Sequence, residues 1–207
     1  MATYASIAYD QVLANASAMV LLKTIEASSD STISFVNGTD GVVFDSTYKE
    51  YIFSYISVHP SDEYYSLAFN ASDDTSSHAY NITKTASAFL AYHQEDASPS
   101  GLSYNTSHDN TQATGFQNLY ANAGSAADES VSGYLHIYNP ADTTFVKHFI
   151  ARTTGSEYDN HMQDWNMAGY FNTTAALTAI QFKYTSNNID AGTFKLYGVK
   201  YCQDTTI

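Results

Sequence analysis

The chain has 207 residues and a formal net charge of −13, because 8 Lys and Arg oppose 21 Asp and Glu, and it contains one Cys. This excess of acid argues against nucleic acid and anionic membrane surfaces as partners, since phosphate groups bind to basic faces. A single Cys excludes an intrachain disulfide framework and a thiolate metal cluster.

The apolar content indicates a folded domain of an unusual kind. Leu, Ile, Val and Phe together account for 41 residues, about a fifth of the chain and close to the level at which disorder is expected. The 18 Tyr add large rings that can be buried, and 60 residues are Ser, Thr or Asn. Many tyrosines with many small polar residues are typical of strands that have one solvated face.

The N-terminal region differs from the rest of the chain. Residues 1–19 are rich in Ala, Ser and Tyr and weakly patterned, which is typical of an arm or a short helix, and an N-terminal arm that continues into the first strand is preferred. This arm lacks the features of a secretory signal, and no window of the chain is apolar enough for a transmembrane helix, so we expect no membrane insertion. Residues 20–207 are predicted to form one domain.

The period of two begins at Met19 and predicts a strand, which we expect to pair with 32–36 across the turn at 28–31. Further strands are predicted at 48–58, 64–70, 80–92, 116–121, 133–138, 144–152, 168–172, 178–185 and 193–201. The last two are expected to pair with each other. Loops are predicted at 94–111, 123–132 and 153–163. About ten short antiparallel strands without a helical period predict an all-β fold, a single jelly-roll-like β-sandwich.

No motif points to catalysis or to a cofactor. The seven His are scattered and show no zinc-ligand spacing, and His59 beside Pro60 predicts a contact at a strand end or in a turn. Acidic pairs occur at 73–74, 95–96 and 128–129, which a glycosidase would require, but adjacent acids on a turn stay hydrated. Nucleophile elbows and phosphate-binding glycine loops are missing. We therefore expect no enzyme, no metal and no cofactor.

Aromatic residues in the predicted loops are the candidates for binding, because a sugar ring can stack on an aromatic face while polar neighbours take its hydroxyl groups. The glycan-contact candidates are Tyr104, His108, Tyr158, His161 and Trp165. Trp165 has an alternative role as a core residue, which is slightly favoured.

Four segments carry a resemblance that does not depend on these patterns. They are DSTYKEYIFSYISVHPS (45–61), ITKTASAFLAYHQE (82–95), ADESVSGYLHIYNPADTTFVKHFIARTT (127–154) and AGYFNTTAALTAIQFKYTSNNIDAGTFKLYGVK (168–200). They resemble virion structural and appendage proteins of marine tailed bacteriophages, cyanophages among them. The segment NIDAGTFKLYG is the most distinctive, and the resemblance spans most of residues 20–200.

The resemblance implies a non-enzymatic virion protein, assembled in the host cytoplasm and exposed on the exterior of the particle. It would be a capsid decoration or fibre protein or a component of a tail appendage. Its partners would be other virion proteins and further copies of itself, with a trimer favoured, and a host surface glycan is a further possible partner. Residues 1–19 would be the arm that docks on a virion partner. The alternative is a carbohydrate-binding module, the receptor-binding head of a tail fibre. An acidic surface suits seawater, where salt screens charge repulsion.

Overall fold

The computed structural model describes residues 18–96 and 99–200, and the fold is all-β, as predicted. Most of residues 1–19, the expected arm, lie outside the described residues, and the first strand starts at Met19. The strands up to the middle of the chain are β1 (Met19–Asp30), β2 (Ile33–Val36), β3 (Glu50–Pro60), β4 (Tyr65–Ser72), β5 (Lys84–Gln94), β6 (Ser100–Tyr104) and β7 (Asn110–Ala113). A 3-10 turn, η1 (Thr106–His108), precedes β7. The remaining strands are β8 (Gln117–Ala123), β9 (Val131–Tyr138), β10 (Lys147–Glu157), β11 (His161–Phe171), β12 (Ala179–Tyr184) and β13 (Ile189–Val199).

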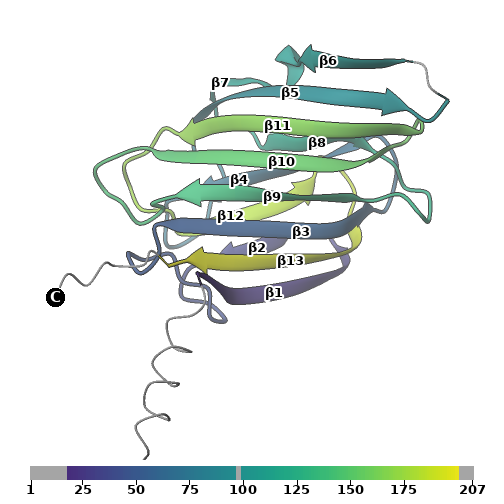
Figure 1. Cartoon of the computed structure of the whole chain (residues 1–207). Coiled ribbons are helices and arrows are strands. Elements are labelled where there is room, and N and C mark those ends of the chain that lie inside the picture. The colour runs from purple at the N-terminus through teal and green to yellow at the C-terminus, as the bar shows by residue number, and fades with distance from the viewer. Residues whose placement is uncertain (1–17, 97–98, 201–207) are drawn as a thin grey trace, which may run out of the picture.

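The strands form two antiparallel layers of a sandwich (Figure 1). The large sheet has the order β1-β13-β3-β9-β10-β11-β5, and both β6 and β7 pair with the far edge of β5. The small sheet behind it has the order β2-β12-β4-β8. The two sheets are joined at one corner, where Glu157 of β10 pairs with Ala123 of β8. The predicted sandwich is therefore confirmed.

Alternating aromatic side chains fill the space between the layers. In β3, Tyr51, Phe53 and Tyr55 are fully buried while the residues between them point away from the core. Phe182 of β12 lies at the centre of this packing. Its ring centroid is 5.4–6.4 Å from those of five other rings, which belong to Phe35, Phe53, Tyr55, Phe69 and Phe194.

Two expected strand pairs are wrong. The strand at 19–30 does not pair with 33–36, because β1 joins β13 in the large sheet whereas β2 joins β12 in the small sheet. The strands β12 and β13 likewise lie in different sheets. At both places a short connection carries the chain from one layer to the other, so these sequence neighbours lie in opposite sheets. This crossing is consistent with the jelly-roll-like prediction.

Two of the expected loops contain strands. Residues 94–111 include β6 and the start of β7, and residues 153–163 hold the end of β10 and the start of β11. The second stretch looked too polar for strands, but its inward polar groups are paired. The Thr153 and Tyr55 hydroxyl oxygens lie 2.5 Å apart, and Trp165 Nε1 donates to Gln163 Oε1 at 2.6 Å. The described residues thus contain thirteen strands instead of about ten.

Two lysines are buried at the same end of the large sheet, on either side of Phe171. Lys147 Nζ donates to the carbonyl oxygens of Phe145 and Thr174, both at 3.0 Å. Lys84 Nζ donates to Ile82 O and Gly115 O, and burial lowers the pKa of Lys84 to about 8. These ammonium groups satisfy backbone carbonyls of the adjoining loops that strand pairing leaves open.

Candidate functional site on the outer face of the large sheet

The outer face of the large sheet carries most of the exposed apolar surface. Eleven large hydrophobic side chains are exposed among the described residues, and nine of them are on this face: Met19, Leu21, Ile56, Phe89, Leu102, Tyr104, Tyr134, Ile150 and Met162. The strand register places them in rows that cross the sheet from β1 to β6. Their concentration on one face of the sandwich makes this face the leading candidate for binding.

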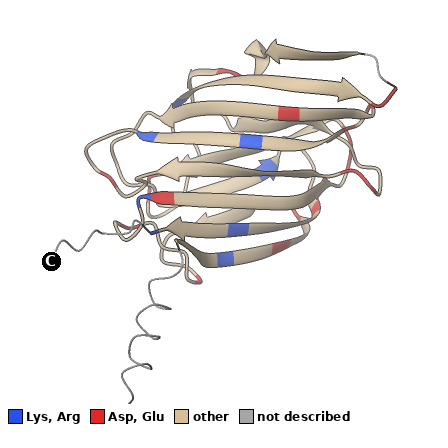
Figure 2. Cartoon of the chain, in the orientation of Figure 1, with Lys and Arg blue, Asp and Glu red and all other residues tan. Residues whose placement is uncertain are grey.

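The face also carries little of the net charge. The outward strand positions hold two cations, Arg152 and Lys195, and four anions, Glu26, Glu50, Asp164 and, at the end of β13, Asp190. Figure 2 shows that most of the other acidic positions lie in the connecting loops. Most of the acidic groups of the described residues therefore lie around this face and not on it. A partner that covers the face meets little of the repulsion that the rest of the chain presents.

An ion pair fixes the middle of the face. Arg152 Nε and Nη2 donate to the two carboxylate oxygens of Asp164 at 2.9 and 2.8 Å. The guanidinium group lowers the pKa of Asp164 through these hydrogen bonds, and the carboxylate raises the pKa of Arg152. This bidentate geometry fixes the orientation of the two side chains, which link β10 and β11. The pair is partly exposed, so its role is to order the surface more than to stabilise the fold.

A groove of about 590 Å³ crosses the upper half of the face, over β10, β11 and β5. Its floor is made of small residues, because Ala168 of β11 lies directly opposite Ser87 of β5. The rings around this floor belong to Tyr104, Tyr138, His148 and Tyr170. A second hollow, of about 480 Å³, lies over β3, β9 and the start of β1, and Ile52, Ile56, Tyr134 and Tyr197 are among the residues that line it.

Polar groups hold the edge of the groove in place. Tyr104 Oη donates to Asp109 Oδ2 at 2.6 Å, and this hydrogen bond raises the pKa of Tyr104. The other oxygen of Asp109 accepts the backbone N–H of Ala88 at 3.1 Å. Across the groove, Gln112 Nε2 reaches Thr85 Oγ1 at 2.8 Å and Tyr170 Oη at 3.4 Å. The groove thus combines aromatic faces with polar groups whose positions are preset.

The predicted glycan contacts do not form one site. Tyr104 is 60% exposed and lines the groove. The ring of His108 instead packs 4.6 Å from the ring of Trp165, and burial lowers the pKa of His108. Tyr158 stacks on Tyr64 at 3.9 Å, away from the groove, and His161 Nδ1 lies 3.3 Å from a carboxylate oxygen of Glu157.

Trp165 requires a correction. Its side chain is 2% exposed and belongs to the core, so a sugar in solution has no access to the ring. The alternation of β11 turns Gln163, Trp165 and Met167 inward. The core role that the sequence slightly favoured is the one that the structure shows.

Three groove residues were missed by the sequence analysis: Tyr138, His148 and Tyr170. All three lie in predicted strands, where an aromatic side chain belongs more often to the core or to a cross-strand pair than to a binding site. The alternation of residues along each strand could have placed all three on one sheet face, since each is next to a buried residue: Ile137, Phe149 or Phe171. Alternation alone does not show which of the two sheet faces is exposed to solvent.

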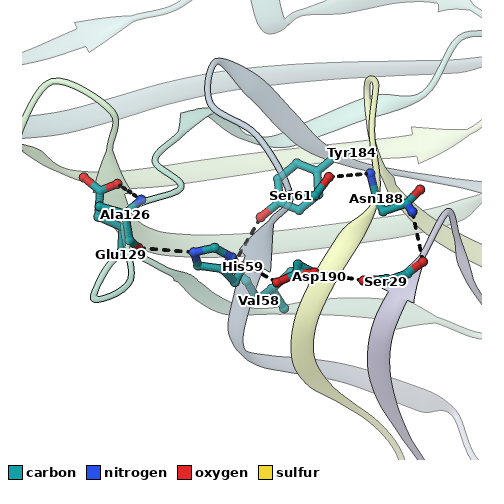
Figure 3. A network of polar contacts seen from close by, with 9 residues as sticks. All are labelled: Ser29, Val58, His59, Ser61, Ala126, Glu129, Tyr184, Asn188 and Asp190. Atoms are coloured by element: carbon teal, nitrogen blue, oxygen red, sulfur yellow. Dashed lines mark hydrogen bonds and ion pairs between the residues drawn. The ribbon is translucent and has the colours of Figure 1, made fainter.

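A polar network at one end of the sandwich contains Ser, His and Asp, but not in catalytic order (Figure 3). His59 Nε2 lies 3.2 Å from Ala126 O, and His59 Nδ1 lies 4.0 Å from Asp190 Oδ2. Ser29 Oγ donates to Asp190 at 2.9 Å, so the carboxylate stands between the hydroxyl and the imidazole. In a hydrolytic triad the imidazole must take the hydroxyl proton. The network ties strand ends and turns together, and the predicted strand-end contact of His59 is confirmed.

The acidic pair at 73–74 also has a structural environment. The Asp74 carboxylate accepts the backbone N–H groups of residues 76–79 at 2.6–3.0 Å. These hydrogen bonds hold its pKa well below the usual range. A general acid needs the opposite shift. Asp73 accepts a hydrogen bond from Thr173 Oγ1 at 2.8 Å.

Among residues 18–96 and 99–200, no group of three or more His, Cys, Asp or Glu side chains is arranged to hold a metal ion. In the same part of the chain, no helix is long and apolar enough to cross a membrane. No family model, no curated protein and no solved structure matches the chain. The candidate site therefore rests on its own geometry.

Proposed function

We propose that this chain is a non-enzymatic structural protein of a bacteriophage virion. It serves as a capsid decoration or fibre protein or as a component of a tail appendage, displayed on the exterior of the particle. The observation that supports this function best is the outer face of the large sheet, which holds nine of the eleven exposed large hydrophobic side chains of the described residues and little of the net charge of an acidic chain. Such a face suits assembly with other proteins, because an uncovered apolar patch gains most from a protein partner.

The proposal predicts many copies of the chain in each particle. Particles purified from a lysate of the encoding virus would be digested, and the chain would be counted by quantitative mass spectrometry against a major capsid protein. A decoration, fibre or appendage protein should occur at a fixed ratio to that capsid protein in every preparation. Particles that lack the chain would contradict the proposal.

The partners are other virion proteins and further copies of this chain, with a trimer favoured. We expect the purified chain to associate at micromolar concentration, as measured by light scattering after size-exclusion chromatography. Leu21→Asp and Ile56→Asp place a charge at exposed apolar positions on β1 and β3, and each should weaken association by at least about tenfold because desolvating a lone charge is unfavourable.

Phe145→Asp is the matched control for these variants. Phe145 is 70% exposed but lies in the loop between β9 and β10, so its replacement should leave association unchanged. A wild-type chain that remains monomeric would contradict self-association. If Phe145→Asp weakens association as much as Leu21→Asp and Ile56→Asp do, the large sheet is not the interface.

A second candidate function is supported by the groove over β10, β11 and β5. Tyrosine rings, a carboxylate and small floor residues in one concave site are suited to a sugar. In this case the chain is a carbohydrate-binding module, the receptor-binding head of a tail fibre, and the groove performs host adhesion.

A further inference from the structure

We infer that the groove over β10, β11 and β5 binds an uncharged oligosaccharide of two to four units, with Tyr104 and Tyr170 as the stacking rings and Asp109 as the acceptor of a sugar hydroxyl. The inference rests on the adhesion part of the proposed function and specifies its ligand. The groove volume of about 590 Å³ lies within the range of small-molecule sites.

The strand register gives the groove its shape. The opposed Ser87 and Ala168 form a low floor. Tyr170 is two residues from Ala168 in one direction along the sheet, and Tyr104 lies opposite Phe89, two residues from Ser87 in the other direction. Given the rise and spacing of strands, the two tyrosine positions are roughly 13 Å apart along the strands and, because β5 lies between them, roughly 10 Å apart across the sheet. An oligosaccharide that crosses the floor diagonally can therefore contact a tyrosine near each of its ends.

The rings provide the apolar contact that a sugar requires. An aromatic face is weakly negative, so it attracts the polarised C–H groups of a pyranose face. Tyr104 is 60% exposed, and its hydroxyl is tied to Asp109 at 2.6 Å, which limits the rotation of the ring before a ligand arrives. The His148 ring lies 6.2 Å from Tyr170 and continues the aromatic wall. Rings held in place lose little entropy on binding.

The polar lining selects for hydroxyl groups without charge. Asp109 uses one acceptor position of each oxygen, for Tyr104 Oη and Ala88 N, and a carboxylate has about four such positions. The remaining positions can accept sugar hydroxyls as charge-assisted hydrogen bonds. The groove lining contains Asp109 but no Lys or Arg, on a chain of charge −13. Repulsion therefore disfavours uronates, sialic acids and phosphorylated sugars.

The same topology disfavours an extended peptide as the ligand. A bound strand needs an open sheet edge with unpaired backbone groups. The edge of β5 that borders the groove is already paired, with β6 at residues 89–93 and with β7 at residues 84–86. The groove offers side chains from a sheet face, and these are suited to a ligand that brings its own hydroxyl groups.

The test is a glycan array probed with the full chain. The array carries neutral di- to tetrasaccharides of hexoses and N-acetylhexosamines, together with uronate-containing oligosaccharides of the same lengths. We expect binding to a subset of the neutral probes and at least tenfold weaker binding to the uronates. The Kd for the best neutral probe is then measured by calorimetry.

Two variants examine the groove in different ways. Tyr104→Ala removes an exposed stacking ring and should raise the Kd at least tenfold. Ser87→Trp fills the floor while every tyrosine stays in place, and it should abolish binding. Because Ser87 is an exposed strand position, the larger ring is compatible with the fold, which circular dichroism and thermal melting check. Phe145→Ala removes an exposed ring outside the groove and should leave the Kd unchanged.

Three outcomes would overturn the inference: no neutral probe bound, a preference for uronates, or binding that survives both groove variants. Each is independent of copy counting in particles. A chain that is abundant in virions but binds no sugar would support the structural role and contradict the sugar site. Sugar binding by a chain that is absent from virions would support the sugar site and contradict the structural role.

Discussion

Between about pH 10 and pH 12 the folded chain is expected to unfold cooperatively, because several tyrosine hydroxyls are buried in the core. Tyr55, Tyr120 and Tyr184 are almost completely buried, and desolvation raises the pKa of each far above that of a free tyrosine. Tyr51 follows with a pKa raised to about 12. An unfolded chain exposes the same groups to water, where they ionise near pH 10.

The sign of the effect follows from proton binding. Below pH 10 both states keep these protons, so the stability from the buried neutral hydroxyls is fully present. Above pH 10 the unfolded state releases protons that the folded state retains, so the free energy of unfolding falls as pH rises. With three retained protons, the fall is about 4 kcal/mol for each pH unit. Typical domains have about 5–15 kcal/mol of stability, so this slope unfolds the chain within a few pH units.

At lower pH, Lys84 has the opposite effect on the pH dependence of the free energy of unfolding. Its pKa is lowered to about 8 in the folded state, whereas an exposed lysine titrates near 10.4. The folded state therefore releases this proton first, and the free energy of unfolding should rise by up to about 1.4 kcal/mol for each pH unit between pH 8 and pH 10. Lys84→Met should remove this rise and leave the unfolding above pH 10 in place.

The measurement combines denaturant melts at each pH with the phenolate absorbance near 295 nm. Tyr184→Phe removes one of the three buried hydroxyls, which donates to Val58 O, and should reduce the slope by about 1.4 kcal/mol per pH unit. The prediction fails if the tyrosines ionise gradually near pH 10 while the sandwich stays folded.

Phe182→Ala is expected to lower the free energy of unfolding by about 3–5 kcal/mol, the range for removing a large buried aromatic side chain. Phe182 has no exposed surface, and its ring contacts five others from both sheets. Because those rings are anchored on paired strands, they cannot close the cavity. For a chain of this length the melting temperature should fall by roughly 10 °C.

Chemical denaturation of the two proteins tests this expectation. The midpoint should shift while the m-value stays the same, because the surface exposed on unfolding is nearly unchanged. Phe145→Ala removes the same atoms from an exposed loop position and should change stability by less than about 0.5 kcal/mol. A loss below about 1 kcal/mol for Phe182→Ala would show that the two sheets are not held together by this aromatic cluster.

The candidate site was partly visible in the sequence. Tyr104 was identified because it lies in a Ser-, Asn- and Gly-rich segment, and it does line the groove. Trp165 and His108 come from similar polar stretches but pack against each other, since β11 extends further than its polar residues indicated. Tyr138, His148 and Tyr170 come from three separate strands, and only their pairing brings them to one groove.

The sequence by itself determined the class of fold. The period of two in segments such as 48–58, the turn residues between them and the many tyrosines suffice for an antiparallel sandwich, because these are local properties of the chain. The tertiary structure decided which strands pair and which sheet face stays uncovered. Alternation defines two faces without saying which one meets a second layer. The distribution of charge and the groove depend on that choice, and so does any function of this face.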